Sequence, residues 1–185
     1  MCPSGFFCLE GSKLPTACEE GKYSLPGAKT EDDCIDCLAG YYCVLGVTTS
    51  YMKECPPGHY CPAGENQPIQ CKKGYYNPED KSESVEDCLI CPAGTACNKP
   101  GINAYEGYYC KPGFYCPANS YQNIPCPPGT FRPSRGGAVN DTIRYSERFT
   151  QPQGCYACPA GFWCPSEATL IPKLCPPGKY CEEGA

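Results

Sequence analysis

Cysteine is the residue type in this sequence whose spacing can support chemistry. Three Cys-x-x-Cys elements occur, at Cys34 to Cys37, Cys88 to Cys91 and Cys155 to Cys158. Zinc ribbons and thiol oxidoreductases use this spacing. A zinc site needs a second such pair or histidines at matching spacing, and the chain has one histidine. We therefore interpret these elements as parts of structural disulfides, keep zinc or redox chemistry as the alternative, and expect no cofactor and no metal.

The single histidine, His59, occupies a position that holds unrelated residue types in other copies of the same short motif. We expect it to be a solvent-facing turn residue. With no repeated histidine, no expected free cysteine and no Ser/His/Asp constellation, neither nucleophilic nor acid/base catalysis has its parts. The sequence predicts that this chain is not an enzyme.

Acidic clusters precede the Cys-x-x-Cys elements: Glu31 to Asp33, Asp80 with Glu83, and Glu86 with Asp87. Calcium binding is the alternative reading, but these clusters lack the alternating ligand pattern of a calcium loop. We expect them to form a solvated charged face.

The composition excludes an ordinary apolar core. Leu, Ile, Val and Phe supply 25 of 185 residues, below the roughly 20% under which chains tend towards disorder. Cysteine supplies 20 residues, which is typical of a disulfide scaffold in an oxidising compartment. We expect an extracellular or cell-surface, secreted location.

Charge and hydropathy exclude two classes of partner. The net charge is −5, and Lys and Arg form no stripe that could follow a phosphate backbone, so we expect no nucleic acid. No run approaches the roughly 18 apolar residues of a membrane span. Met1 is followed at once by Cys-Pro-Ser-Gly without a leader, and we therefore expect a longer parent protein.

The cysteines repeat with one spacing three times and then begin again. The sets are Cys2, Cys8, Cys18, Cys34, Cys37, Cys43; Cys55, Cys61, Cys71, Cys88, Cys91, Cys97; Cys110, Cys116, Cys126, Cys155, Cys158, Cys164; and Cys175, Cys181. The third set carries an insertion between Cys126 and Cys155. Such self-similarity indicates a repeat architecture.

A shorter motif, Cys-x-x-Gly-x-aromatic, occurs ten times within this pattern. It begins at Cys2, Cys18, Cys37, Cys55, Cys71, Cys91, Cys110, Cys126, Cys158 and Cys175. Its invariant glycine indicates a turn with positive φ. Its aromatic residue, replaced once by Ala96, is expected to cover a neighbouring disulfide.

The segments between these turns favour short strands. We expect pairs of strands near Lys22 to Ser24, Tyr41 to Val44, Tyr75 to Asn77 and Phe114 to Tyr115, with little or no helix. Copies too small to bury an apolar core alone should stack end to end. The predicted fold class is small disulfide-rich repeats, forming an elongated rod of short β-hairpins and turns.

The units from Cys18 to Cys34 and from Cys55 to Cys61 resemble ephrin-receptor-like cysteine-rich repeats, which are close in pattern to tumour necrosis factor receptor modules. The resemblance covers essentially the whole chain and implies a large extracellular or surface protein. In the receptor-module frame, residues 1–17 are the closing half of a preceding repeat. Repeats then follow at 18–70, 71–125 and 126–185, the last with an inserted loop at about 132–153.

The resemblance also implies first-with-second, third-with-fifth and fourth-with-sixth pairing. The implied disulfides are Cys18–Cys34, Cys37–Cys55, Cys43–Cys61, Cys71–Cys88, Cys91–Cys110, Cys97–Cys116, Cys126–Cys155, Cys158–Cys175 and Cys164–Cys181. Cys2 and Cys8 are then left over, as the closing pair of a copy whose opening cysteines are absent. A frame like that of epidermal growth factor, starting at Cys2, instead leaves Cys175 and Cys181 over, and both frames remain open.

The insertion carries two further expectations. Asn140-Asp141-Thr142 is the only glycosylation sequon, and we expect an N-linked glycan on Asn140. The loop is locally basic, with Arg132, Arg135, Arg144 and Arg148. It is either a decorated surface loop or a contact to an acidic neighbour such as another copy of the chain.

Two functions fit this pattern. The first is a structural tandem-repeat segment of an extracellular or cell-surface protein, such as a fibre, coat or wall subunit, whose partners are adjoining repeats or copies of itself joined head to tail. The second is a ligand-binding segment of a receptor ectodomain. Fold-level likeness does not decide between them.

Overall fold

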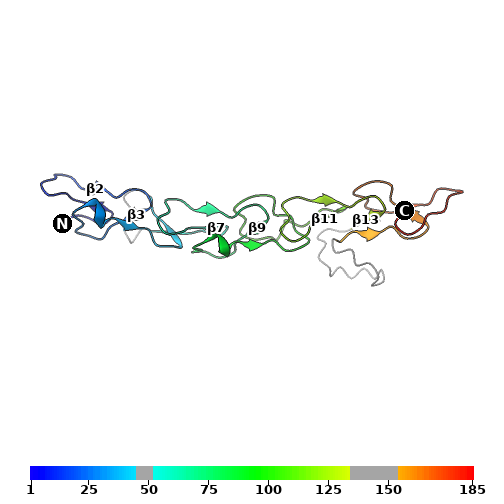
Figure 1. Ribbon diagram of the computed structural model, residues 1–185, viewed down its shortest axis with the longest axis horizontal. Helices are drawn as coiled ribbons and strands as arrows, with labels where there is room; N and C mark the ends of the chain where they lie inside the picture. The colour runs from blue at the N-terminus through cyan, green and yellow to red at the C-terminus, as the bar shows by residue number, and fades with distance from the viewer. Residues whose placement is uncertain (45–51, 134–153) are drawn as a thin grey trace. The chain divides into compact units, whose positions relative to one another are not determined.

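The computed structural model describes residues 1–44, 52–133 and 154–185. The chain forms two compact units. Unit 1 comprises Met1–Leu89 with Pro100–Ala104, and unit 2 comprises Ile90–Lys99 with Tyr105–Ala185. Both consist of short hairpins joined by turns (Figure 1). The three-repeat division at residues 18, 71 and 126 and the elongated rod stay predictions.

Every strand among the described residues is two residues long. The strands are β1 (Phe6–Phe7), β2 (Thr16–Ala17), β3 (Lys22–Tyr23), β4 (Ile35–Asp36), β5 (Tyr41–Tyr42), β6 (Lys53–Glu54), β7 (His59–Tyr60), β8 (Ile69–Gln70), β9 (Tyr75–Tyr76), β10 (Leu89–Ile90), β11 (Phe114–Tyr115), β12 (Ile124–Pro125), β13 (Thr130–Phe131), β14 (Tyr156–Ala157), β15 (Phe162–Trp163) and β16 (Lys173–Leu174). The described residues contain no α-helix, only the 3₁₀ turns η1 (Glu31–Asp33) and η3 (Val85–Asp87). The predicted fold class of small disulfide-rich repeats with short hairpins is therefore confirmed.

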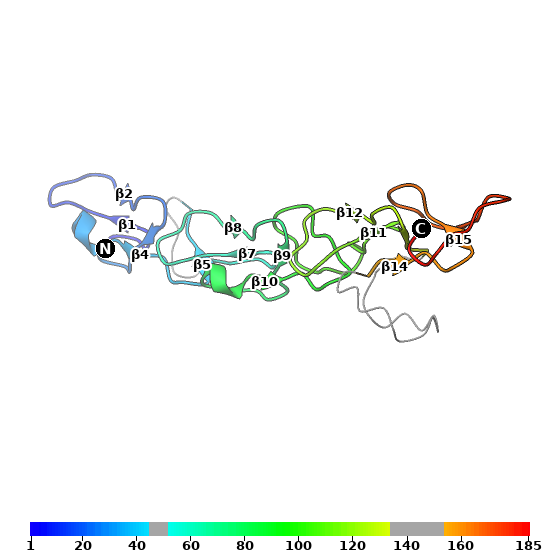
Figure 2. The same cartoon turned by 45° about the vertical axis from the view of Figure 1, so that its right-hand side comes forward.

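The strands pair consecutively into two-stranded sheets, from β1 with β2 to β15 with β16. The strands β7 and β8, labelled in Figure 2, form one of these antiparallel hairpins. In it His59 lies opposite Gln70 and Tyr60 opposite Ile69. The first strand of each hairpin holds the two residues after the motif glycine, and the second strand immediately precedes the first cysteine of the next motif. The four expected strand positions are confirmed, although three of the strands are one or two residues shorter than expected.

The motif glycine forms the turn that starts each hairpin. At Gly21, φ is +82°, and the N–H of Lys22 donates to the carbonyl of Glu19 at 3.1 Å. The third residue of this four-residue turn has positive φ, a conformation that residues with a side chain rarely adopt and that glycine adopts readily. The glycine expectation is therefore confirmed here.

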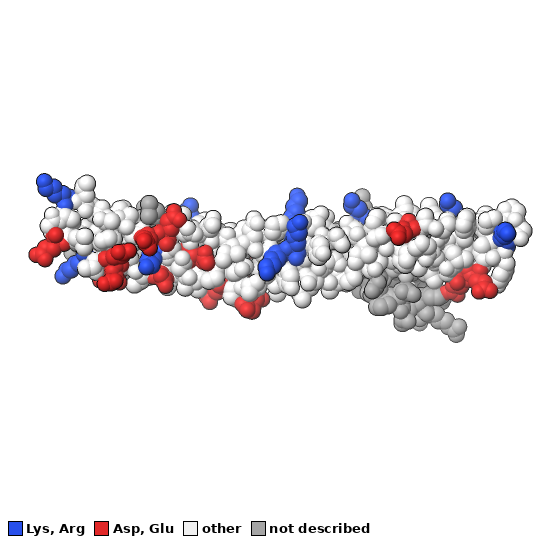
Figure 3. All heavy atoms as spheres, turned by 45° about the horizontal axis from the view of Figure 1, so that its top comes forward, with Lys and Arg blue, Asp and Glu red and all other residues white. Residues whose placement is uncertain are grey.

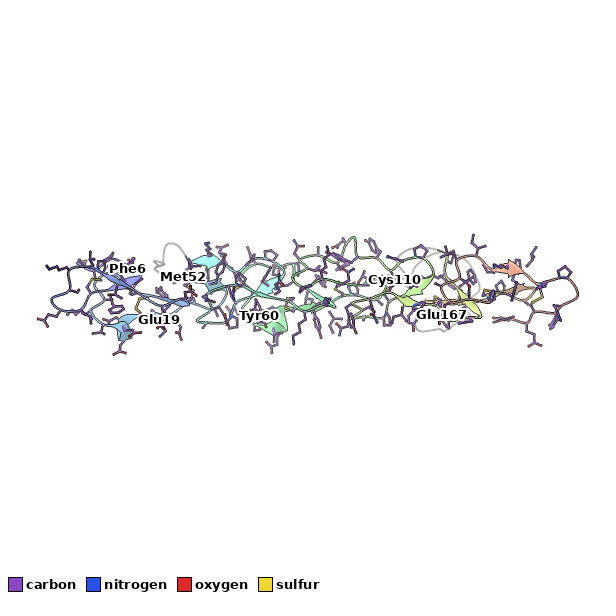
Figure 4. All side chains as sticks on the ribbon, turned by 90° about the horizontal axis from the view of Figure 1, so that it is seen from above. Phe6, Glu19, Met52, Tyr60, Cys110 and Glu167 are labelled. Atoms are coloured by element: carbon purple, nitrogen blue, oxygen red, sulfur yellow. A yellow bond between two sulfur atoms is a disulfide. The ribbon has the colours of Figure 1, made fainter. Side chains whose placement is uncertain are left out.

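Cystine forms most of the buried interior. Among the described residues, the buried hydrophobic set consists of cysteines together with Tyr23, Ala28, Ala96 and Ile102. Tyr23 packs against the Cys37–Cys43 disulfide of the next motif, with Tyr41 and Met52 beside it. Met52 is labelled in Figure 4. The expectation that an aromatic ring covers a neighbouring disulfide is confirmed at Tyr23.

No helix among the described residues has the length and hydrophobicity needed to cross a membrane.

Side-chain charge is unevenly divided between the units. Unit 1 contains 14 Asp and Glu against 7 Lys, a net charge of −7, whereas unit 2 contains 6 acidic and 8 basic residues, a net charge of +2. Several acidic side chains gather on the face of unit 1 shown in Figure 3.

Candidate functional site

All twenty cysteines form ten disulfides, and none is free. Seven disulfides join the first and seventh residues of one motif. They are Cys2–Cys8, Cys37–Cys43, Cys55–Cys61, Cys91–Cys97, Cys110–Cys116, Cys158–Cys164 and Cys175–Cys181. Three close longer loops: Cys18–Cys34, Cys71–Cys88 and Cys126–Cys155, with sequence separations of 16, 17 and 29.

The pairing implied by the receptor-module resemblance agrees with the three long disulfides and is wrong for the other six. The incorrect pairs are Cys37–Cys55, Cys43–Cys61, Cys91–Cys110, Cys97–Cys116, Cys158–Cys175 and Cys164–Cys181. The reason is local, because the glycine turn brings the first and seventh residues of a motif together, with a Cα–Cα distance of 5.9 Å in Cys55–Cys61. That distance suits a disulfide.

Cys2 and Cys8 belong to this same short class. The interpretation of residues 1–17 as a closing pair whose partners are absent is therefore wrong. The growth-factor-like frame fails too, because Cys175 and Cys181 bond each other.

The two cysteines of each Cys-x-x-Cys element belong to different disulfides. Cys34 bonds Cys18, whereas Cys37 bonds Cys43. Thiolates ligate zinc and carry out thiol exchange, and sulfur held in a disulfide is not a thiolate. The described residues also contain no group of three His, Cys, Asp or Glu placed to hold a metal ion. This geometry gives the zinc and redox alternative no support.

Successive motifs are joined by a recurring set of four backbone hydrogen bonds, which we call a junction. Motif positions are counted from the first cysteine. Between the motifs at Cys55 and Cys71, the N–H of Gly58 donates to the carbonyl of Asn77 at 2.7 Å, and the N–H of Cys71 donates to the carbonyl of Gly58 at 2.9 Å. The N–H of Lys81 donates to the carbonyl of Cys55 at 2.8 Å, and the N–H of Cys61 donates to the carbonyl of Ser82 at 2.9 Å.

The same four bonds recur along the chain. Complete sets follow the motifs that begin at Cys2, Cys37, Cys55, Cys91, Cys126 and Cys158. The preceding motif contributes the carbonyl of position 1, both backbone groups of the position-4 glycine and the N–H of position 7. The following motif contributes the N–H of position 1, the carbonyl of position 7 and two groups of a turn at its positions 10 to 12, which we call the docking turn. Because every partner is a backbone group, most side chains at a junction can vary.

The docking turn requires positive φ. Its donor residue is Gly27, Gly64, Lys81, Gly101, Asn119, Ala168 or Gly184. All three described non-glycine residues with positive φ are in this group: Lys81 at +53°, Asn119 at +65° and Ala168 at +55°. Such a conformation is uncommon for residues with a side chain, and its recurrence at one site indicates that the junction imposes it.

Three motifs replace the position-7 cysteine with a polar residue: Ser24, Asn77 or Arg132. These are the motifs whose first cysteine forms a long disulfide. The three side chains are buried, with 0%, 1% and 2% of their surface exposed. Sequence reasoning missed them, although the absence of cysteine from a position that holds it in seven motifs was the available signal.

Each of the three buried polar side chains donates to a backbone carbonyl. Ser24 Oγ donates to the carbonyl of Phe6 at 2.8 Å, and Asn77 Nδ2 donates to the carbonyl of His59 at 2.9 Å. Phe6 and His59 both occupy position 5 of the preceding motif. Arg132 Nη1 donates to the carbonyl of Gly154. Hydrogen bonding offsets the cost of burying a polar group. Ser24 and Asn77 therefore stabilise the contact with the preceding motif, whereas the bond from Arg132 lies within its own motif, next to Cys155.

Two of the acidic clusters cap local backbone. Asp33 Oδ2 accepts from the N–H groups of Lys29 and Thr30 at 2.7 and 3.0 Å. Asp87 Oδ2 accepts in the same way from Glu83 and Ser84 at 2.8 and 2.9 Å. These backbone hydrogen bonds, from Thr30 and then Lys29, lower the pKa of Asp33. The carboxylates of Asp33 and Asp87 thus stabilise the 3₁₀ turns that precede Cys34 and Cys88. The sequence predicted only that these acidic clusters form a solvated charged face, without this capping role.

Several expected site residues lie elsewhere. His59 is half-buried rather than fully solvent-facing, with Nδ1 3.1 Å from the carbonyl of Pro57. Arg132 was expected in the basic surface loop, and that expectation is wrong because it is a buried position-7 residue. Asn140, Arg135, Arg144 and Arg148 lie outside the described residues.

Comparisons with known proteins give partial matches. No protein-family model matches the chain. Sushi, von Willebrand factor type A, EGF and pentraxin domain-containing protein 1 of Mus musculus is 26% identical over 144 residues, covering 77% of this chain and 4% of that protein. Cysteine repeat modular protein B of Toxoplasma gondii is 27% identical over 132 residues, covering 66% of this chain and 2% of that protein.

A third match has a different kind of name. ABC-type transporter claG of Penicillium crustosum is 35% identical over 74 residues, covering 34% of this chain and 10% of that protein. The chain therefore spans a tenth or less of each of these three relatives. It is similar to cysteine-rich repeat segments of larger proteins, and the matches do not single out the ephrin-receptor-like or tumour necrosis factor receptor family.

Proposed function

We propose that this chain is a structural tandem-repeat segment of an extracellular or cell-surface protein and has no enzymatic activity. The observation that carries the proposal is the junction, in which the same four backbone bonds connect successive motifs at six places. A contact made by backbone alone can be repeated while side chains change, as in other solenoid-like arrays. Such a segment sets the spacing between the parts of a protein that flank it.

The relatives support a role that does not depend on one activity. Their names include a cysteine repeat modular protein and an ABC-type transporter. Function belongs to sites placed on a fold rather than to the fold itself. A cysteine-rich segment shared by proteins of such different kinds is better explained as a scaffold than as a catalytic unit.

The disulfides support the extracellular part of the proposal. Ten disulfides account for every cysteine, and seven of them lie within single motifs. Disulfides persist in oxidising environments and are rare where glutathione keeps thiols reduced. Secretion or surface display would also expose Asn140 to glycosylation.

Labelling of intact cells tests the proposed location. Cells that express the natural parent protein are treated with a membrane-impermeant biotin reagent, and the captured peptides are analysed by mass spectrometry without reduction. We expect biotin on the segment, the ten disulfides described above and glycan on Asn140. Labelling only after permeabilisation, or free thiols in the captured peptides, would contradict an extracellular location.

A receptor ectodomain is the second candidate, and one surface favours it. In unit 2, an open depression is lined by Gly107, Tyr109, Lys111, Pro112, Phe114 and Leu170. Tyr109 and Leu170 expose about half of their surface, 52% and 47%, and exposed apolar patches often mark binding sites. A single-pass membrane anchor in the parent sequence would favour this candidate, whereas many further repeats without an anchor would favour the structural one.

A fibre, coat or wall is the setting in which the structural segment is expected to act. Cys2 and Cys8 give no support to copies joining head to tail, because they bond each other.

A further inference from the structure

The ten disulfides follow one another along the chain without overlap. Each closes before the next begins, from Cys2–Cys8 to Cys175–Cys181. The three long disulfides end three residues before the next motif begins, as Cys88 precedes Cys91. No disulfide therefore connects two motifs, and successive motifs are held together only by the chain itself and by non-covalent contacts.

Six segments of the chain are closed by no cross-link, and we call them arms. Each runs from the second cysteine of a short disulfide to the first cysteine of the next motif. The arms are residues 9–17, 44–54, 62–70, 98–109, 117–125 and 165–174. A disulfide across an arm, such as the Cys37–Cys55 pair that the receptor-module resemblance implied, would fix its length. The observed pairing leaves all six arms without such a limit.

The arm at 62–70 spans little distance while it is folded. It returns on itself in the hairpin of β7 and β8, so that His59 lies opposite Gln70. Directly opposed residues of antiparallel strands are about 5 Å apart, whereas the ten Cα–Cα steps from Cys61 to Cys71 reach about 34 Å when extended. Opening this arm therefore adds roughly 25 Å to the distance that the chain covers.

Few contacts hold this arm in its folded position. None of its residues is buried, and β7 and β8 have two residues each. Its docking turn is bonded to the preceding motif from Gly64 to Cys37 at 2.9 Å. A second bond runs from Cys43 to Glu65 at 3.0 Å, and Asn66 adds one exposed side-chain bond. Because a two-stranded hairpin alone is marginally stable and regions with few buried contacts open locally, we expect the arm to open first when the chain is stretched.

The disulfide-closed part of each motif resists stretching. Cys55 and Cys61 are fully buried, and their disulfide holds the two Cα atoms 5.9 Å apart. In a long motif the disulfide also encloses the docking turn, as Cys71–Cys88 encloses Lys81. Tension can therefore lengthen the arms, whereas the disulfide-closed loops keep their ends together.

We propose that the chain is an extensible tether, whose arms open under tension and whose disulfides set the limit of extension. Each short disulfide encloses 6 steps and the long ones enclose 16, 17 and 29, so 104 of the 184 Cα–Cα steps stay locked. The other steps and the ten disulfides allow about 330 Å, against about 630 Å for the reduced chain. Because opening breaks no covalent bond, the arms refold when the tension falls. The inference deepens the proposed structural role and rests on it.

Stretching single molecules in an optical trap tests the tether. The full oxidised chain is held by handles at its two ends, pulled until it stops lengthening, relaxed and pulled again. We expect increments of about 25–35 Å, a limit near about 330 Å, and the same increments in the second pull. Extension well beyond this limit, or increments that do not return after relaxation, would overturn the proposal. A chain that keeps its folded length until the handles detach would also overturn it, and the structural role would then be that of a spacer of fixed length.

Two double variants test whether the disulfides set the limit. Cys71→Ala with Cys88→Ala frees 17 steps and should raise the limit by about 50 Å. Cys55→Ala with Cys61→Ala frees 6 steps and should raise it by about 15 Å. The measurement holds even where a variant folds poorly, because the limit is read from the fully stretched chain. The same limit in both variants and in the natural sequence would show that disulfides do not set it.

Two substitutions at Gly64 test whether docking holds the arm closed. Gly64 has φ of +82°, which a β-branched residue rarely adopts, and an added Cβ would meet only Asp36, at 3.6 Å. Gly64→Val should therefore raise the opening rate of one arm at fixed low tension by roughly tenfold or more. The matched control is Gly64→Asn, because Asn119 occupies the same place in another junction with φ of +65°. An unchanged rate in Gly64→Val, or the same increase in Gly64→Asn, would overturn the docked arm as the element that opens.

Discussion

At the junction glycines, backbone conformation and close packing impose separate requirements. Gly40 has φ of +80° and lies beneath the carbonyl of Lys81, whereas Gly11 has φ of +79° in open surroundings. The pair therefore separates the cost of left-handed backbone from the cost of a close contact. The carbonyl of Lys81 cannot move freely, because the N–H of the same residue is bonded to Cys55.

Gly40→Ala should destabilise the chain more than Gly11→Ala. Both substitutions carry the left-handed penalty of about 1–2 kcal/mol. Only Gly40→Ala adds the cost of overpacking, which is typically about 1–3 kcal/mol. Equilibrium denaturation of the oxidised proteins in guanidinium chloride measures the difference, and equal losses for the two variants would contradict the packing at Gly40.

A second residue-scale prediction concerns pH. Backbone hydrogen bonds lower the folded-state pKa of Asp33, below the ordinary value of about 3.9. A group whose pKa falls on folding stabilises the fold above its unfolded-state pKa, and this contribution is lost as the pH falls through the folded-state pKa. The carboxylate titration of Asp33, followed by NMR, should therefore have its midpoint below that ordinary value.

Asp33→Asn is the control for this effect. An amide oxygen can still accept from Lys29 and Thr30 but does not titrate in this range, so the variant should lose less stability between pH 5 and 2 than the natural sequence. A midpoint for Asp33 at or above the ordinary value would contradict the capping geometry.

At the scale of elements, each hairpin is held by one of two kinds of disulfide. The short kind closes a turn within a motif, as in Cys55–Cys61. The long kind joins the first cysteine of a motif to the residue just before the second strand of the hairpin, as in Cys71–Cys88, where β10 begins at Leu89. Asn77 accompanies the long kind. Its Nδ2 donates to Ser82 Oγ at 2.7 Å as well as to His59, so a buried amide takes the place of the missing short disulfide.

Removing a long disulfide should cost more than removing a short one. In the chain-entropy model, the stabilisation grows with loop length as 1.5RT ln n and is about 3 kcal/mol for a 15-residue loop. The double variant Cys71→Ala with Cys88→Ala should therefore lose roughly 1 kcal/mol more than Cys55→Ala with Cys61→Ala. Both pairs are buried in unit 1, which makes them a matched comparison. A larger loss for the short pair, measured by denaturant unfolding, would show that packing outweighs loop entropy.

For the whole molecule, the interior depends on cystine in both units. The buried clusters pair disulfides with few other residues, as in Tyr23 with Cys37–Cys43 in unit 1 and Ala96 with Cys110–Cys116 in unit 2. Reduction removes these cross-links and leaves too little apolar surface to replace them. The stability of both units should therefore depend on the oxidised state.

Excess reductant should unfold the chain. We expect loss of the near-ultraviolet circular dichroism of the Tyr and Trp residues, together with a larger hydrodynamic radius. The untreated chain, denatured without reductant, should show no titratable thiols. A reduced chain that kept the radius and spectrum of the oxidised one would show that the hairpins hold together without disulfides.

Local features were determined by the sequence alone. The spacing of Cys-x-x-Gly-x-aromatic located the glycine turns and the first strands, because turn formation depends on φ preferences within a few residues. The strands near Lys22 and Tyr75 end before Ser24 and Asn77, since the carbonyl of Ser24 and both backbone groups of Asn77 are bonded to neighbouring motifs. The disulfide-rich fold class followed from composition, because so few apolar residues cannot form a core.

Only the tertiary structure decided how the cysteines pair and which polar residues are buried. Six cysteines permit fifteen connectivities, and the choice depends on which Cα atoms come within bonding range, 5.9 Å in Cys55–Cys61. Ser24, Asn77 and Arg132 resemble surface residues in the sequence. They are buried because position 7 lies at the junction with a neighbouring motif, a contact between residues about twenty positions apart that no local preference encodes.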